Sequence, residues 1–169
     1  MSAPVRLPGV LTVLESARLV RLGERLGFTS GDTVGGGRVG RRNHICWLDH
    51  TVETADVYAT VQRTFEASAE CFGVELSEME LIQLARYDVG DCYDWHSDVT
   101  LEEPERRRLS MSIELSSPDA YRGGELSFLD HDVPGRPDRG SALIFEPGLA
   151  HQVAPVVYGA RYALVAWAA

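Results

Sequence analysis

The stretch Tyr93-Asp94-Trp95-His96-Ser97-Asp98, together with His151 further along the chain, is the most informative feature of this sequence. In an extended strand, residues i and i+2 project from the same face, so His96 and Asp98 aim an imidazole and a carboxylate at a common point. His151, from a distant strand, would complete a facial triad of two histidines and one carboxylate, which leaves one side of an Fe(II) ion open. His-x-Asp alone occurs by chance in many soluble chains. The metal-site interpretation therefore depends on the residues that follow it.

Arg161 is the second informative residue, because it begins an otherwise apolar stretch that ends at Trp167. A buried guanidinium needs a partner, and its planar fork matches a carboxylate. The alternative is an arginine at a strand end whose charged head reaches water. The His-x-Asp pair and the histidine upstream favour the carboxylate-binding interpretation.

The segment from His151 to Trp167 predicts a hairpin with a turn at Tyr158-Gly159. Alternation along its second strand separates two faces. One face carries Tyr162, Leu164 and Ala166, and the other carries Arg161, Ala163, Val165 and Trp167.

With these residues the chain resembles the Fe(II)/2-oxoglutarate dioxygenases, and in particular their prolyl 4-hydroxylase-like branch. The resemblance covers roughly residues 81 to 169 and rests on five ordered motifs, which together are far more specific than any one of them. The motifs are Ala85 to Asp98 with its tyrosine, glycine, tyrosine, His-x-Asp run, Arg108 to Leu115, Tyr121 to Phe128, Gly140 to Pro147, and the set His151, Val153, Pro155-Val156, Gly159 and Arg161.

The resemblance implies a mainly β chain with flanking helices (α+β), built on a double-stranded β-helix, the cupin-like jelly roll. We expect one domain over residues 1–169, with helical N-terminal support in 1–80 and the β core in 81–169. Residue patterns agree, since helices are indicated from about Glu15 to Leu26 and from Thr54 to Cys71, and short β-rich segments follow Leu81. A short strand is expected over Val10 to Val13.

The resemblance also implies what the site residues do. His96, Asp98 and His151 would hold Fe(II) as the catalytic centre, and Arg161 would bind the C5 carboxylate of the cosubstrate 2-oxoglutarate. Tyr87 and Tyr93 would line the cosubstrate or substrate pocket, although a buried tyrosine whose hydroxyl bonds a backbone carbonyl is an equal alternative. Dioxygen would be the other cosubstrate, and ascorbate an optional reductant.

The implied reaction is hydroxylation of an aliphatic C–H bond, with a prolyl residue of a peptide or protein as the first substrate class. A free amino acid or small metabolite is the second. An AlkB-type nucleic-acid demethylase is disfavoured, because its second arginine, six residues after the first, is Trp167 here, and the net charge of −9 repels nucleic acid. A noncatalytic cupin-like module is disfavoured because metal storage needs no carboxylate clamp like Arg161.

One residue departs from the branch, since many relatives carry a tyrosine at the position of Glu114. Ser110, Ser112 and Glu114 share one face of a strand. If that face points inward, Glu114 would repel the C5 carboxylate unless it pairs with Arg161 or with a substrate cation. If the face points outward, the glutamate is solvated.

The glycine-rich segment from Gly31 to Arg42 reads as a loop near the substrate entrance. Its arginines, Arg38, Arg41 and Arg42, would recruit an acidic or carboxylate-bearing substrate, or would only keep a connector solvated. The other histidines, among them His44, show no ligand-like spacing.

Composition sets the remaining bounds. The 169 residues are 44% hydrophobic and 24% charged, as in ordinary soluble domains. No apolar run approaches the about 20 residues of a membrane span, and the N-terminus lacks a signal-peptide core. Cys46, Cys71 and Cys92 are odd in number and widely spaced, which indicates reduced thiols. We therefore expect a cytoplasmic protein without a membrane partner, whose oligomeric state the sequence leaves open.

Overall fold

The computed structural model describes residues 1–31, 40–100, 102–133 and 135–169. Its elements, in chain order, are β1 (Val5–Leu7), α1 (Val13–Leu26), β2 (Thr29–Ser30), β3 (Arg41–Arg42), β4 (His44–Leu48), α2 (Ala55–Phe72), β5 (Ile82–Tyr87), β6 (Cys92–His96), β7 (Leu109–Glu114), β8 (Tyr121–Gly123), β9 (Leu126–Phe128), β10 (Ala142–Phe145), β11 (His151–Val153), β12 (Val156–Gly159) and β13 (Arg161–Ala168).

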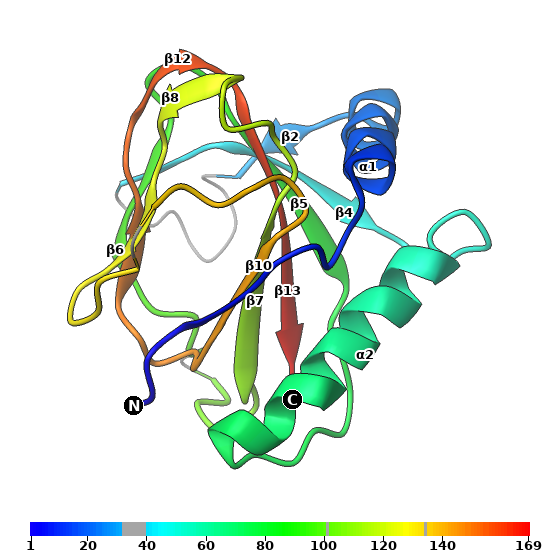
Figure 1. Ribbon diagram of the computed structural model, residues 1–169, viewed down its shortest axis with the longest axis vertical. Helices are drawn as coiled ribbons and strands as arrows, with labels where there is room; N and C mark the ends of the chain where they lie inside the picture. The colour runs from blue at the N-terminus through cyan, green and yellow to red at the C-terminus, as the bar shows by residue number, and fades with distance from the viewer. Residues whose placement is uncertain (32–39, 101, 134) are drawn as a thin grey trace.

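The strands form two facing sheets and a small pair (Figure 1). The large sheet has the order β1-β10-β7-β13-β5-β4-β2, the smaller sheet has the order β3-β6-β11-β9, and β12 pairs with β8. All named pairings are antiparallel. From β5 to β7 and from β9 to β11 the chain crosses between the sheets at each step, which is the winding of a jelly roll. The predicted fold class is confirmed.

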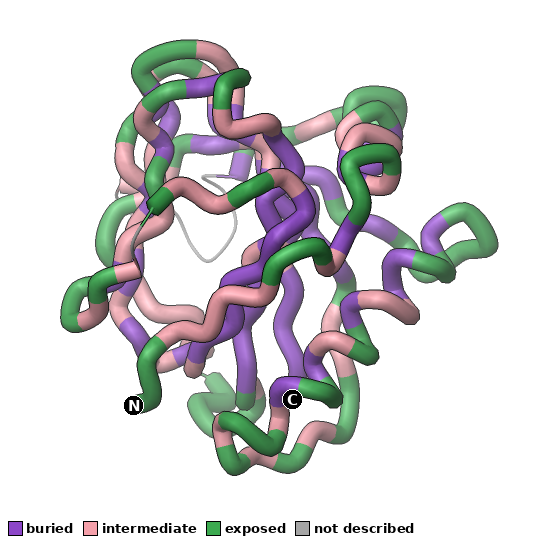
Figure 2. Tube along the Cα trace, in the orientation of Figure 1, coloured by how far each residue is buried: buried purple, intermediate pink, exposed green. Residues whose placement is uncertain are grey.

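Both helices lie on the same side of the molecule, against the large sheet (Figure 1). Leu19 of α1 and Phe65 of α2 are each 1% exposed and belong to one apolar cluster with β4, β5, β7, β10 and β13. The buried residues accordingly concentrate along the central strands, and the connecting loops are exposed (Figure 2). This core supports the large sheet from outside and leaves the space between the two sheets for other residues.

The helix predictions are confirmed, but the expected strand over Val10 to Val13 is wrong. The first strand is β1, and Thr12 instead begins α1 with a capping box: its hydroxyl accepts from the backbone N–H of Glu15, and the Glu15 carboxylate accepts from the backbone N–H of Thr12. The capping box is readable in the sequence as Thr-x-x-Glu.

The N-terminal half contributes more than helical support. β1 pairs with β10 at one end of the large sheet, and β4 pairs with β5 along five residues. That residues 1–169 form one domain stays a prediction. In the described part of the chain, neither helix has the length and apolar character needed to cross a bilayer.

The predicted hairpin from His151 to Trp167 is wrong in its pairing. The strands exist, but β11 pairs with β6 and β9, whereas β13 pairs with β5 and β7 in the other sheet. Gly159, with a φ of 70°, ends β12, and a Cβ there would meet the carbonyl of Ala120 at 2.0 Å. The chain therefore turns a corner at Gly159 instead of folding back on itself.

Candidate active site

A cavity of about 240 Å³ lies between the two sheets, and we name it the intersheet cavity. The large sheet lines it with Gln83, Ala85, Tyr87, Ser112, Arg161, Ala163, Val165 and Trp167, and the other wall includes Tyr93, His96, Asp98, Leu126, His151 and Val153. The face of β13 that alternation assigns to Arg161 and Trp167 is thus the face that lines the cavity.

The cavity brings together the three predicted metal ligands. His96 on β6 lies directly opposite His151 on β11. Asp98 follows the end of β6, where its backbone N–H donates to the carbonyl of Pro147 at 2.8 Å. Its Oδ1 lies 3.9 Å from Nε2 of His96 and 3.7 Å from Nε2 of His151. The ligand atoms of the three residues all lie within 4.8 Å of one another.

Backbone carbonyls set the orientation of both imidazoles. Nδ1 of His96 lies 2.7 Å from the carbonyl of Asp94, and Nδ1 of His151 lies 2.8 Å from that of Leu149. Because a carbonyl only accepts, each Nδ1 carries a hydrogen, and each Nε2 is directed toward Asp98. In the neutral imidazole, Nε2 is then the nitrogen available to a metal.

The carboxylate of Asp98 is also prepared for a cation. Ser110 donates its hydroxyl to Oδ2 at 2.7 Å. Burial disfavours the charged form, but His151, the Ser110 hydroxyl and His96 outweigh it and hold the pKa of Asp98 below its usual value. Two imidazole nitrogens and an ionised carboxylate are a donor set that suits Fe(II), so the residues fit the metal that the sequence predicts.

A bulge in β6 places Tyr93 on the cavity side with His96. The partners of β11 shift from His151–His96 to Val153–Tyr93, so two residues of β6 oppose one residue of β11. Strict alternation would put Tyr93 and His96 on opposite faces. With the bulge, both line the cavity, and their rings stack with centroids 3.5 Å apart.

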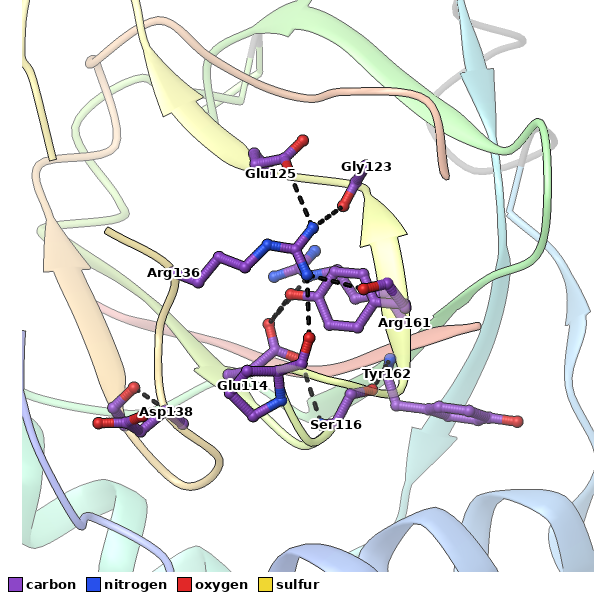
Figure 3. A network of polar contacts seen from close by, with 11 residues as sticks. Glu114, Ser116, Gly123, Glu125, Arg136, Asp138, Arg161 and Tyr162 are labelled. Atoms are coloured by element: carbon purple, nitrogen blue, oxygen red, sulfur yellow. Dashed lines mark hydrogen bonds and ion pairs between the residues drawn. The ribbon is translucent and has the colours of Figure 1, made fainter. Parts of the chain in front are cut away.

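Glu114 points inward and pairs with Arg161, which selects one of the two orientations that the sequence left open. Nε of Arg161 donates to Oε2 of Glu114 at 2.9 Å, and the two residues are 3% and 2% exposed. Tyr121 donates its hydroxyl to the same oxygen at 3.1 Å, and the backbone N–H of Ser116 donates to the other (Figure 3). The bond to Glu114 uses one of the five N–H donors of the guanidinium.

Charge and burial shift the pKa values in this network. Burial disfavours the charged guanidinium, yet Glu114 outweighs it and raises the pKa of Arg161. Burial, and then the charge of Glu114, raise the pKa of Tyr121 to about 12. Tyr87, whose ring centroid lies 5.8 Å from Cζ of Arg161, is buried in the intersheet cavity, and burial raises its pKa. Arg161 is thus a fixed cation, and both tyrosines stay protonated.

The segment from Gly31 to Arg42 is described only at its ends. Arg38 lies outside the described residues. Arg41 lines the intersheet cavity, and Cζ of its guanidinium lies 4.8 Å from the ring centroid of Tyr93. Arg42, next to it on β3, is exposed, and its Nε lies 4.0 Å from a carboxylate oxygen of Asp91.

A second cluster, of His44, Asp88 and Asp91, also has metal-like spacing, with ligand atoms within 4.8 Å. The sequence gives no hint of it, because His44 is on β4 and the aspartates lie between β5 and β6. Nδ1 of His44 lies 3.4 Å from Asp91 and 3.7 Å from Asp88, and Arg86 binds Asp88 at 2.8 Å. Arg86 neutralises part of the negative charge of this cluster. We therefore interpret the cluster as a network of polar contacts and not as a metal site.

A family model described as the 2OG-Fe(II) oxygenase superfamily matches residues 82–169, which include the triad and Arg161. The chain belongs to this superfamily. The description names oxygenases that depend on Fe(II) and 2-oxoglutarate, and dioxygen is a cosubstrate in such enzymes.

Among curated relatives, the chain is 39% identical to a PKHD-type hydroxylase of Maricaulis maris over 88 residues, which are 51% of this chain and 40% of the relative. It is 26% identical to a PKHD-type hydroxylase of Colwellia psychrerythraea over 96% of this chain and 76% of the relative. For the first three curated relatives that it matches, the chain spans less than half of their length, 40% in each case.

Solved structures show the same fold at low identity. A Pseudomonas putida prolyl-4-hydroxylase matches with a TM-score of 0.80 and 22% identity, over 98% of this chain and 92% of that one. A prolyl hydroxylase from Trichoplax adhaerens, in complex with a hypoxia inducible factor peptide fragment, matches with a TM-score of 0.81 and 19% identity, over 98% and 83%.

We expect one Fe(II) per chain, held by His96, Asp98 and His151. Replacing one ligand, in His96→Ala, should weaken Fe(II) binding by more than about 100-fold in an anaerobic titration. The matched control is His44→Ala, which removes the histidine of the other cluster and should leave the affinity unchanged. If the two variants exchange these results, the iron site is the His44 cluster.

We also expect Glu114→Gln to tighten 2-oxoglutarate binding by about tenfold, because it removes a buried negative charge beside Arg161. Without cosubstrate the same variant should unfold at a lower temperature, because Arg161 loses its buried partner. Calorimetric titration and thermal unfolding measure the two effects. Glu125→Gln is the comparison: its half-exposed carboxylate forms an ion pair with Arg136 and acts on Arg161 only at longer range, so its effect on the affinity should be much smaller. An unchanged affinity in Glu114→Gln would place the cosubstrate away from this pair.

Proposed function

We propose that this chain is an Fe(II)- and 2-oxoglutarate-dependent dioxygenase that hydroxylates an aliphatic C–H bond of a prolyl residue in a peptide or protein. One observation carries the proposal: the intersheet cavity joins a metal-binding triad to a buried arginine. Arg161, His96, Asp98 and His151 all line this cavity. A cosubstrate with a carboxylate at each end would meet the metal at one end and the guanidinium at the other.

Each group in the cavity has a defined task in this proposal. The Nε2 atoms of His96 and His151 and Oδ1 of Asp98 hold the metal, and Ser110 keeps Oδ2 turned away from it. Bound Fe(II), with 2-oxoglutarate and dioxygen, supplies the oxidising chemistry. Arg161 binds the C5 carboxylate of the cosubstrate with the donors that Glu114 leaves available. Apolar residues such as Val153 and Val165 keep water out of the path between the two ends.

The mouth of the cavity supports a prolyl substrate. Trp47, 41% exposed, lines it, and the buried Trp167 lies behind with its ring centroid 6.3 Å from that of Trp47. An exposed aromatic ring is a surface on which extended, proline-containing segments dock. The relatives named as prolyl hydroxylases support the same substrate class by analogy.

A free amino acid or small metabolite is the second candidate, favoured by the guanidinium of Arg41 in the cavity wall. Exclusion of nucleic acid, a cytoplasmic location and stimulation by ascorbate stay predictions of the sequence.

Mass spectrometry of products tests the proposal. Proline-containing peptides, free proline and methylated oligonucleotides are offered side by side with Fe(II) and 2-oxoglutarate, and the peptides should gain the mass of one oxygen atom. The control is His151→Ala, which should yield no product because a metal ligand is missing.

Oxidation of free proline alone would move the reaction to the second candidate. Demethylation of the oligonucleotides with untouched peptides and proline would contradict the substrate class altogether.

A further inference from the structure

The intersheet cavity contains a cation that lacks an acidic partner among the described residues. Three of its described lining residues are arginines: Arg41, Arg107 and Arg161. Arg107 binds both carboxylate oxygens of Glu80, at 2.8 and 2.6 Å, and Arg161 pairs with Glu114. Arg41 differs, since the ion pairs of the described chain do not include it.

Neutral groups hold the guanidinium of Arg41 in place. Its Nε donates to the side-chain oxygen of Asn43 at 3.1 Å, and its Nη2 donates to that of Gln83 at 3.3 Å. Both amides are buried, and the ring of Tyr93 packs against the guanidinium. These contacts orient the side chain without neutralising its charge, which is the arrangement expected of a group that binds an anion.

The position of Arg41 indicates that the anion it would bind belongs to the substrate and not to the cosubstrate. Tyr93 contacts the Arg41 guanidinium and also stacks on His96, so Arg41 lies on the wall that carries a metal ligand. Gln83, which accepts a hydrogen bond from Arg41, lies on β5 four residues before Tyr87. Tyr87 lies opposite Arg161 in the pairing of β5 with β13. The C5 carboxylate is proposed to lie at the Arg161 end of the cavity. Arg41 lies near Trp47, which is opposite Gln83 in the pairing of β4 with β5, and therefore at the mouth.

We propose that Arg41 binds a carboxylate of the substrate, so that the preferred substrate carries a carboxylate next to the residue that is hydroxylated. This inference rests on the proposed function, which places the metal beside His96 and the cosubstrate at Arg161. The carboxylate has two possible sources: an acidic side chain beside the proline of a peptide, or the α-carboxylate of a C-terminal or free proline.

Arg42 provides a matched control on the same strand. It is adjacent to Arg41, but its side chain is 72% exposed and lies near Asp91 instead of lining the cavity. Arg41→Gln and Arg42→Gln therefore remove the same charge from opposite faces of β3. Arg41→Lys keeps the charge in case loss of the guanidinium contacts in Arg41→Gln disturbs the fold.

The experiment is an equilibrium titration of the protein loaded with Mn(II) and 2-oxoglutarate. The ligands come in pairs that differ by one charge: capped peptides with Asp or Asn after proline, peptides that end in proline with a free or amidated terminus, and proline with prolinamide. In the wild type, at least one carboxylate ligand should bind about tenfold tighter than its neutral counterpart. Arg41→Gln should abolish this preference, whereas Arg42→Gln and Arg41→Lys should retain it.

The responding pair identifies the source of the carboxylate. Because binding is measured without turnover, the result is separate from the proposed reaction. A preference for carboxylate ligands that depends on Arg41, found together with no hydroxylated product, would contradict prolyl hydroxylation but would support carboxylate binding by Arg41. Wild-type protein that binds no carboxylate ligand more tightly than its neutral counterpart, or that binds none of the ligands, would overturn the inference. So would a preference that survives in Arg41→Gln.

Discussion

The buried ion pair between Arg161 and Glu114 is the interaction around which one end of the cavity is arranged. A guanidinium removed from water needs a charged partner, and breaking such a pair from one side costs about 3–5 kcal/mol. Glu114 supplies that partner from β7, the neighbour of β13 in the large sheet. Tyr121 and the backbone of Ser116 fix the carboxylate in turn, so the guanidinium has one orientation before any cosubstrate arrives.

This arrangement gives the cavity a cation whose charge is already shared. A dicarboxylate that enters must compete electrostatically with Glu114 for Arg161, whereas a tyrosine at that position would leave the full charge available. The pair therefore keeps the empty cavity stable and weakens the hold on the cosubstrate. At the other end, the β6–β11 pairing and the carbonyls of Asp94 and Leu149 give the two histidines one orientation. Both ends of the cavity are thus set by contacts within the chain.

Local periodicity predicts both helices, and ligand spacing predicts that His96, Asp98 and His151 come together. The jelly roll is implied by the resemblance to the dioxygenases and not by periodicity. The sequence does not predict the partners of β13, since alternation tells which face a residue occupies but not which strand lies beside it. The β6 bulge, which brings Tyr93 beside His96, is a property of two paired strands and has no local signal. The orientation of Glu114 and the approach of His44 to Asp91 likewise depend on contacts between distant segments.

We expect Arg161 to select the cosubstrate by its far carboxylate. The most direct measurement compares the affinity for 2-oxoglutarate with that for 2-oxobutyrate, which lacks this carboxylate, in protein loaded with Mn(II). The comparison uses the wild type and the double variant Arg161→Gln/Glu114→Gln, which removes both charges and leaves neither buried alone. The wild type should prefer 2-oxoglutarate by about 100-fold, as expected for charge-assisted hydrogen bonds, and the double variant should show almost no preference. An undiminished preference in the double variant, with Mn(II) affinity unchanged, would show that Arg161 does not bind the far carboxylate.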